Sequence, residues 1–242
     1  MSLNNNKVEK WDEGSQLYSI IRCVENSMIQ QQYGQNDFDI TEREPCFEGF
    51  FKLDRFHFKH KRFDGSWSRT VGREIFIRGD ATCVLPYDPV ENCVVLVEQF
   101  RIGAVSLEEG QNKCGASPWL IELVAGINEE GENPEDVARR ESVEEANLEL
   151  GEIMPICKYL ASPGGSTEKV HLYCAQVDSR GAGGVFGLAE EDEDIRVHIV
   201  PFEDALLMIE CGQINNAAAI IALQWLALNH SLVKQTWLPE TK

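Results

Sequence analysis

The chain has 242 residues, 43% of them hydrophobic, with 40 acidic against 22 basic side chains and a net charge of −18. A chain of this length can bury a sizeable core in one or two domains, and its 11 phenylalanines argue against disorder. The acidic excess opposes general nucleic-acid binding and docking on anionic membranes. It favours a soluble protein that recruits cations.

Residues 1–14 are polar and contain no apolar segment typical of a secretory signal, so we expect a frayed end and a cytoplasmic protein. The longest apolar run, Ala217 to Leu228, is interrupted by Gln224 and is too short to span a bilayer. The eight cysteines form no C-x-x-C pair, which disfavours a structural zinc site. Most lie in apolar segments such as those around Cys83 and Cys93, and we interpret them as buried free thiols in a reducing compartment.

The first third of the chain, from about residue 15 to 79, favours β-strands. Residues 55–60 alternate apolar and polar side chains, and Asp64-Gly65 favours a hairpin turn with Trp67 and Val71 on the returning strand. Residues 43–78 contain nine Lys or Arg against five Asp or Glu. This basic region is either a surface for phosphate or an acidic partner, or an ordinary solvated strand face.

From about residue 80, short apolar runs between turn signals predict buried strands. These strands are expected at 81–86, 93–100, 119–125, 156–162, 169–177 and 195–201. Two helices are expected near the C-terminus, at 203–211 and 216–230. Gly212 suits the end of the first, and Asn215 or Asn216 suits the cap of the second. The order of elements predicts a sheet flanked by helices.

A further helix is predicted inside the stretch from Gly126 to Leu150, which holds nine carboxylates and only two arginines. Asn133 is a good cap, Pro134 suits the first helical position, and Glu135 and Asp136 favour the positive end of the helix dipole.

At about 100° per residue, this helix gathers its small and apolar side chains on one side and its glutamates on another. The side expected to be buried contains Ala138, Ser142, Val143 and Ala146. The acidic side contains Glu141, Glu144 and Glu145. The acidic side is either a solvated face or a site for a hard divalent cation, which prefers oxygen ligands. No lysine occurs between Lys113 and Lys158 to relieve the repulsion, which favours the cation.

The spacing from Gly126 through Glu132 to the segment RESVEEANL at 140–148 resembles the Nudix box. The resemblance implies the α+β Nudix fold, in which a mixed sheet is sandwiched between helices. Ser142 stands where the family prefers an aliphatic residue, and Asn147 replaces a glycine. Asparagine tolerates the left-handed conformation that ends a helix, so Asn147 can serve as the stop.

By this resemblance, three side chains would bind Mg²⁺, or Mn²⁺ in its place: Glu141, Glu144 and Glu145. The backbone carbonyl of Ala125 would add a ligand, Arg140 would orient the glutamates by ion pairing, and Glu132 would hold the loop before the helix. Gly126, at the start of the box, would lie against the substrate.

Segments outside the box resemble the bacterial ADP-ribose pyrophosphatases of this family over about residues 40–236. They include EGFFKLDRF, GREIFIRGDA, VEQFRIGA, PWLIELVAG, YLASPGG, GLAEEDEDIRVHIV and NAAAIIALQWL. In that group the adenine stacks on an aromatic residue and an arginine of the partner subunit, which match Phe50 and Arg73. Without the resemblance, Phe50 would be interpreted as a core aromatic. Arg101 matches an arginine that contacts the diphosphate or its ribose, and Pro163 matches a proline that follows the box.

The acidic run 190–194 would be a mobile surface loop by composition alone. By resemblance it closes over the substrate, and Glu191 and Glu193 would serve as general base and as a residue that positions metal or water. Glu168 is the alternative base, with Glu191 preferred.

The resemblance implies metal-dependent hydrolysis of ADP-ribose to AMP and ribose 5-phosphate by a homodimer. Residues 1–79 would form an N-terminal antiparallel, β-rich region for dimerisation and adenine binding, and residues 80–242 the catalytic domain. The alternatives are a hydrolase of another nucleotide sugar such as GDP-mannose or ADP-glucose, a non-catalytic Nudix-fold sensor, and an acidic scaffold protein. The insert 106–117 is longer than usual and has no assigned role.

Overall fold

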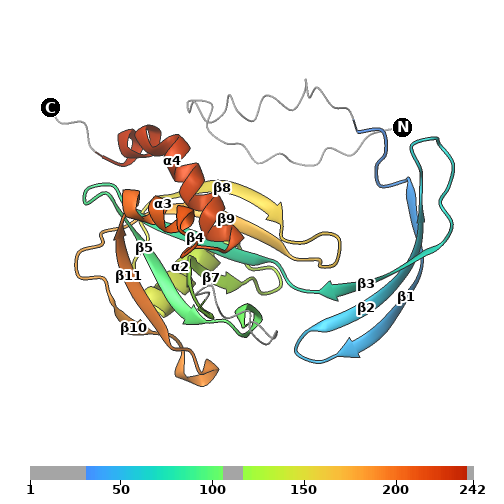
Figure 1. Ribbon diagram of the computed structural model, residues 1–242, viewed down its shortest axis with the longest axis horizontal. Helices are drawn as coiled ribbons and strands as arrows, with labels where there is room; N and C mark the ends of the chain where they lie inside the picture. The colour runs from blue at the N-terminus through green and yellow to red at the C-terminus, as the bar shows by residue number, and fades with distance from the viewer. Residues whose placement is uncertain (1–30, 106–116, 239–242) are drawn as a thin grey trace. The chain divides into compact units, whose positions relative to one another are not determined.

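The computed structural model describes residues 31–105 and 117–238 (Figure 1). The chain divides into two compact units, one of residues 1–43 with 56–72 and the other of residues 44–55 with 73–242. The domain boundary expected at residue 79 stays a prediction. The expected frayed segment 1–14 and nearly all of the insert 106–117 lie outside the described residues.

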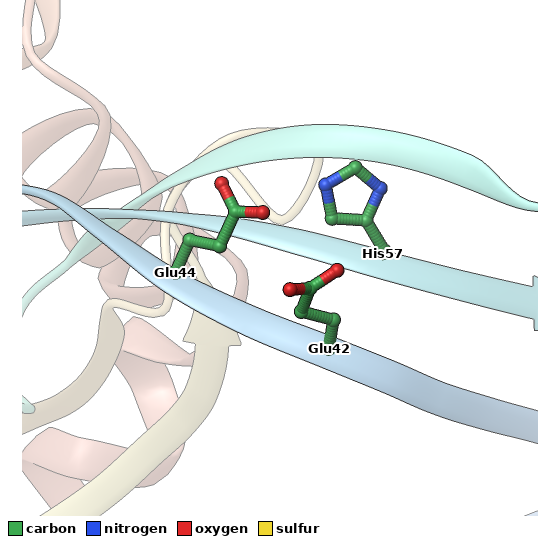
Figure 2. A group of neighbouring side chains, drawn as sticks. All are labelled: Glu42, Glu44 and His57. Atoms are coloured by element: carbon green, nitrogen blue, oxygen red, sulfur yellow. The ribbon is translucent and has the colours of Figure 1, made fainter.

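The N-terminal strands β1 (Phe38–Glu48), β2 (Lys52–His60) and β3 (Val71–Ile77) form a sheet in that order. Strand alternation places Glu42 and Glu44, two residues apart, on the same face of β1 (Figure 2). The predicted hairpin turn is confirmed: Gly65 has φ of +83°, and its N–H donates to the carbonyl of Arg62 at 2.8 Å.

The second sheet has eight strands, with the main path β10-β11-β5-β4-β9-β8. Its strands are β4 (Ala81–Asp88), β5 (Cys93–Phe100), β6 (Trp119–Glu122), β7 (Val124–Ile127), β8 (Ile153–Leu160), β9 (Lys169–Gln176), β10 (Gly184–Phe186) and β11 (Ile195–Pro201). The pairing of β4 with β9 is parallel and the other pairings are antiparallel.

Two details differ from the strands predicted from the sequence. The strand expected at 119–125 is divided at Leu123, because β6 pairs with β5 whereas β7 pairs with β4. The glycine-rich connection at 181–187 contains the short strand β10, whose pairing with β11 supplies hydrogen bonds that no hydrophobic pattern signals.

Helices cover the two faces of this sheet (Figure 1). They are α2 (Pro134–Ala146), α3 (Phe202–Glu210) and α4 (Ala217–Trp237), with short 3-10 helices η2 (Ile102–Ala104) and η4 (Ala189–Glu191). Helices α3 and α4 pack into one core cluster and α2 into the other. The sheet flanked by helices is therefore confirmed, and Asn216 caps α4 by accepting the N–H of Ala219 at 3.1 Å.

Helix α4 is longer than predicted. Its 21 residues are long and apolar enough to cross a membrane by length and composition, and in the described part of the chain it is the one helix of this kind. The expectation that its apolar run is too short was therefore wrong on length. Six of its side chains are buried in the core: Ala219, Ala222, Leu223, Leu226, Val233 and Trp237. We therefore describe α4 as a helix packed on the sheet.

The burial predicted for α2 is correct except at one position. Ala138, Ser142 and Ala146 are buried, but Val143 is 51% exposed. At about 100° per residue, Val143 lies about 140° around the helix from Ala138, whereas Glu145 lies only about 20° away. The sheet-facing side of α2 therefore includes Glu145, which is 3% exposed.

The cysteines were predicted to be buried free thiols. All six described cysteines are free. Cys83, Cys93 and Cys174 are buried as expected, but Cys46, Cys157 and Cys211 are exposed. The prediction of burial was wrong for these three, because flanking apolar residues do not fix which face of a strand or helix end a side chain occupies.

The hydroxyl of Ser142 is fully buried and has no hydrogen-bond partner among the described residues. Because an unpaired buried hydroxyl costs free energy, Ser142→Ala should raise the free energy of unfolding by about 1 kcal/mol. Ser68→Ala is the matched control, since the Ser68 hydroxyl accepts the N–H of His60 at 3.0 Å and donates to the carbonyl of Arg69 at 2.8 Å. That variant should lose stability. Denaturant unfolding measures both, and a destabilised Ser142→Ala variant would contradict the assignment.

Candidate active site

A cleft of about 1040 Å³ opens where two neighbouring strands of the larger sheet separate. Strands β4 and β5 pair only at Tyr87 with Val94 and at Asp88 with Cys93. Beyond that point β7 continues along β4 and β6 along β5. The lining includes Cys83 on β4, Arg101 after β5 and Glu122 on β6.

Glu145 is the most deeply buried acidic group of the cleft. Its carboxylate accepts the backbone N–H of Ala125 at 3.0 Å. Burial raises the pKa of Glu145 to about 8, against the opposing effect of this hydrogen bond, and the charges of Glu141 and Glu193 raise it further. The folded protein therefore disfavours the ionised form of Glu145, whose charge would need water or a cation to stabilise it.

Arg140 gathers three other carboxylates of the stretch. It contacts Glu141 at 2.7 Å, Glu144 at 3.0 Å and Glu132 at 3.4 Å. Glu132 also accepts the N–H of Glu129 at 3.1 Å, which closes the loop before α2. Burial nevertheless raises the pKa of Glu141 to about 7, because it outweighs the lowering by Arg140. The structure contains the predicted ion pairs of Arg140 with Glu141 and Glu144. The role of Arg140 in orienting these glutamates stays a prediction.

Gly126 on β7 leaves the space that the Glu141 side chain of α2 occupies. A Cβ atom on Gly126 would overlap the carboxylate of Glu141. A side chain at this position would therefore push Glu141 out of place, which gives a steric reason for a glycine that the sequence could mark only by resemblance.

The residues present fit a hard divalent cation. Their donors are carboxylate oxygens and a backbone carbonyl beside Glu145, with no soft or nitrogen ligand required. The buried Glu145 carboxylate has a backbone N–H as its hydrogen-bond partner and no ion pair in the described residues. Arg140 holds Glu141 and Glu144 apart from it, so the three glutamates do not form a compact ligand group by themselves.

A second set of metal-ligating side-chain types lies on the N-terminal sheet: Glu42 and Glu44 on β1, and His57 on β2 (Figure 2). Exposed acidic groups of this kind are common without a metal, and Glu44 is also ion-paired with Arg55 at 4.0 Å. Its residues belong to both compact units. We assign no metal site there.

Several predicted substrate residues lie in the cleft. Phe50 lines it and is 88% exposed, so the alternative of a core aromatic was wrong. Arg101 lines it and is held through its Nε by Glu122 at 2.9 Å. Glu168 lines it too, ion-paired with Arg78 at 3.3 Å.

Other predicted residues are placed differently. Arg73 and Pro163 are exposed and are not among the described residues that line the cleft, and neither is Glu144. Glu193 lines the cleft, whereas only the backbone of Glu191, in η4, is described. The roles of all these residues stay predictions.

The lining residues that sequence reasoning missed include Arg78, Glu122 and Cys83. Glu122 carried a usable signal, because a single carboxylate inside the apolar run WLIELVA calls for a local partner or a function. Arg78 carried none: its guanidinium lies over Phe51, 5.0 Å from the ring centre, through a contact that only the fold creates.

The comparison with known families decides which of the predicted classes applies. The NUDIX domain profile matches residues 77–222, which include the whole cleft except Phe50. The chain belongs to the Nudix family. Helix α2 lies within the matched residues, and its Glu141 and Glu145 line the cleft.

The Nudix relatives include characterised pyrophosphatases. The ADP-ribose pyrophosphatase of Escherichia coli K12 is 49% identical over 205 residues, covering 85% of this chain and 95% of that protein. The ADP-ribose pyrophosphatase of Haemophilus influenzae is 47% identical over 207 residues, covering 86% and 94%. A GDP-mannose pyrophosphatase of Escherichia coli O1:K1 is 35% identical over 184 residues, covering 76% and 91%.

A solved structure supports the same Nudix fold. A crystal structure of an ADP compounds hydrolase superposes with a TM-score of 0.60 at 17% identity, covering 83% of this chain and 96% of that one. At this identity the likeness concerns the fold alone.

The buried Nudix glutamate should reduce the stability of the metal-free protein. Because the pKa of Glu145 rises from 4.5 to about 8 on folding, the folded state binds more protons between these values. The free energy of unfolding must then fall as pH rises through this window. With EDTA present, Glu145→Gln should remove that loss and raise Tm at pH 8, by roughly 2–4 °C per kcal/mol recovered.

The control is Glu149→Gln, which neutralises an exposed carboxylate just beyond the same helix. This control measures how much Tm rises simply because one negative charge has been removed from an acidic protein. Thermal unfolding in EDTA from pH 4 to pH 9 gives the comparison. Equal Tm changes in the two variants at every pH would show that burial of Glu145 imposes no such cost.

Proposed function

We propose that this protein hydrolyses ADP-ribose to AMP and ribose 5-phosphate with a divalent cation. One observation carries the proposal: the chain matches nearly the full length of ADP-ribose pyrophosphatases at 47–49% identity. The cleft is consistent with that substrate, because it combines carboxylates for a cation with arginines for a diphosphate and an exposed aromatic ring for a base.

The substrate would be held at three chemically distinct points. Phe50 offers an exposed ring at the cleft, which suits stacking against adenine. Arg101 uses its Nε for Glu122, and its two terminal amino groups have no hydrogen bond among the described residues, so we propose that they donate to diphosphate oxygens. Arg78 presents a second guanidinium in the same cleft.

The cation proposed is Mg²⁺, with Mn²⁺ as a substitute, held by Glu145, Glu141 and Glu144 and by the carbonyl of Ala125. When bound, it supplies neutralisation of the diphosphate charge. To bind the cation, Glu141 and Glu144 would give up their ion pairs with Arg140. A glutamate then accepts the proton of the attacking water. Glu191, Glu193 and Glu168 are the candidates; the carboxylate of Glu168 is paired with Arg78, and that of Glu193 accepts the N–H of Leu188.

We further propose that the protein is a cytoplasmic homodimer, in which Arg73 of one subunit serves the adenine of the partner's cleft, whereas Phe50 lines the cleft of its own subunit. The observation that favours this arrangement is the exposure of large apolar side chains on the N-terminal sheet, including Phe38, Ile40 and Phe47. Exposed apolar side chains gathered on one sheet favour burial against another protein surface.

Hydrolysis of GDP-mannose is the second candidate, because a GDP-mannose pyrophosphatase also aligns with most of the chain. ADP-glucose hydrolysis and a non-catalytic sensor remain as further outcomes of the test. The acidic scaffold is disfavoured, because a scaffold has no need of a buried carboxylate in a cleft.

The proposal predicts release of AMP from ADP-ribose in Mg²⁺ and its loss in EDTA. The assay runs the same protein beside GDP-mannose and ADP-glucose, with chromatographic detection of the nucleotide product. Faster turnover of GDP-mannose would transfer the assignment to the second candidate. Binding of ADP-ribose in calorimetry without turnover would support the sensor.

Phe50→Ala should raise KM for ADP-ribose about tenfold, because it removes a base-stacking surface worth roughly 1–3 kcal/mol, with little change in Tm. Phe63→Ala is the matched control: Phe63 is 87% exposed, close to the value for Phe50, and is not among the described residues that line the cleft. Steady-state kinetics on both variants measure the effect. Equal KM values for the two would remove Phe50 from the substrate site.

A further inference from the structure

The hairpin between β10 and β11 carries Glu193 to the cleft. The last strand pair is Phe186 with Ile195, and the chain between them turns through η4. Two hydrogen bonds continue the pairing into the loop: the N–H of Glu193 donates to the carbonyl of Leu188 at 3.3 Å, and the N–H of Leu188 donates to the Glu193 carboxylate at 3.1 Å. One carboxylate oxygen of Glu193 is thus held by its own loop, and the residue lines the cleft.

Gly187 lies at the neck of this hairpin, directly against Glu193. A Cβ atom at Gly187 would lie 2.6 Å from the Cβ of Glu193 and 3.0 Å from its carbonyl oxygen. Both atoms belong to the rigid part of Glu193, so the clash cannot be relieved by rotating a side-chain end. Gly187 also has φ of +113°, in the region that favours glycine.

The position of Glu193 matters to the α2 carboxylates. Glu193 lines the same cleft as Glu141 and Glu145. After burial, its charge is among the causes that raise the pKa of both. A shift of the Glu193 backbone would therefore change the electrostatics of the cleft as well as the reach of the carboxylate.

We propose that Gly187 is a positioning residue: its missing side chain lets the Leu188 N–H hold the Glu193 carboxylate at the cleft beside Glu141 and Glu145. The inference rests on the proposed function for its effect on turnover. It assigns a role to a residue that touches neither the cation site nor the substrate.

The chain supplies a close control for the test. Gly183 lies four residues earlier in the same glycine-rich segment and has the same φ of +113°, but a Cβ there would meet no atom within 4 Å. Gly183→Ala and Gly187→Ala therefore both place alanine at a φ of +113°, and only the second brings a Cβ against Glu193. A difference between the two variants isolates the contact.

Turnover of ADP-ribose in Mg²⁺ is the first readout. Gly187→Ala should lower kcat by roughly 10- to 100-fold, as expected for a misplacement of about 1 Å. KM should stay within about twofold of wild type, and Gly183→Ala should keep kcat within the same margin. In a Glu193→Ala background, Gly187→Ala should cost nothing more, because the group it positions is gone. Losses that multiply in the double variant, or an equal loss in Gly183→Ala, would overturn the proposal.

The second readout does not depend on activity. The Leu188 amide should be protected from hydrogen exchange in wild type and in Gly183→Ala, and lose protection in both Gly187→Ala and Glu193→Ala. Unchanged protection in Gly187→Ala would overturn the proposal. If wild type fails to hydrolyse ADP-ribose, the proposed function fails, while hydrogen exchange still tests the loop geometry.

Discussion

The burial of one carboxylate, that of Glu145, is the constraint on which the site depends. The side chain lies on the buried face of α2, which also contains Val137, Ala138, Ser142 and Ala146. A backbone N–H from β7 is its hydrogen-bond partner. A charge held in this way is costly unless a cation or a proton accompanies it, and the same helix could have placed an apolar residue there. The burial is understandable if the group is kept for a divalent cation.

The rest of the cleft is arranged around that carboxylate. Gly126 leaves room on β7 for the Glu141 carboxylate, and the N–H of the neighbouring Ala125 donates to Glu145. Arg140 neutralises Glu141 and Glu144 in the absence of a cation. Strands β4 and β5 separate to open the cleft, and the hairpin after β10 contributes Glu193 to its lining. Of the nine carboxylates in the acidic stretch, three pair with Arg140 and one, Glu145, is buried.

Local chemistry made much of the fold predictable. The left-handed Asn147 ends α2 with φ of +50°, as its residue type allows, and Asn133 and Asn216 cap their helices. These features depend on near neighbours in the chain. Val143 was predicted to be buried because the expected apolar side of α2 was centred on the wrong angle. The true centre lies near Ala138 and Glu145, and a charged residue at the centre of a buried face contradicts the hydrophobic periodicity that predicts such a face.

Features that depend on distant segments could not be predicted in this way. The division of the strand at Leu123 reflects competition between two partner strands. The contact of Arg78 with Phe51 and Glu168 joins three separate parts of the chain. The exposure of Phe50 has the same origin, since nothing in the sequence GFFKL distinguishes a ring that lines a cleft from one that fills a core. The Nudix resemblance supplied the candidate residues that composition and periodicity could not.

The central claim, that the buried Glu145 carboxylate is kept for a divalent cation, is tested most directly by the stability of the metal-stripped protein during titration with MgCl₂ at constant ionic strength. A cation that binds only the folded state must raise Tm as its concentration passes the dissociation constant. The account predicts a progressive rise for the wild-type chain and a nearly constant Tm for Glu145→Gln. Equal rises in both proteins, or no rise in wild type, would contradict it.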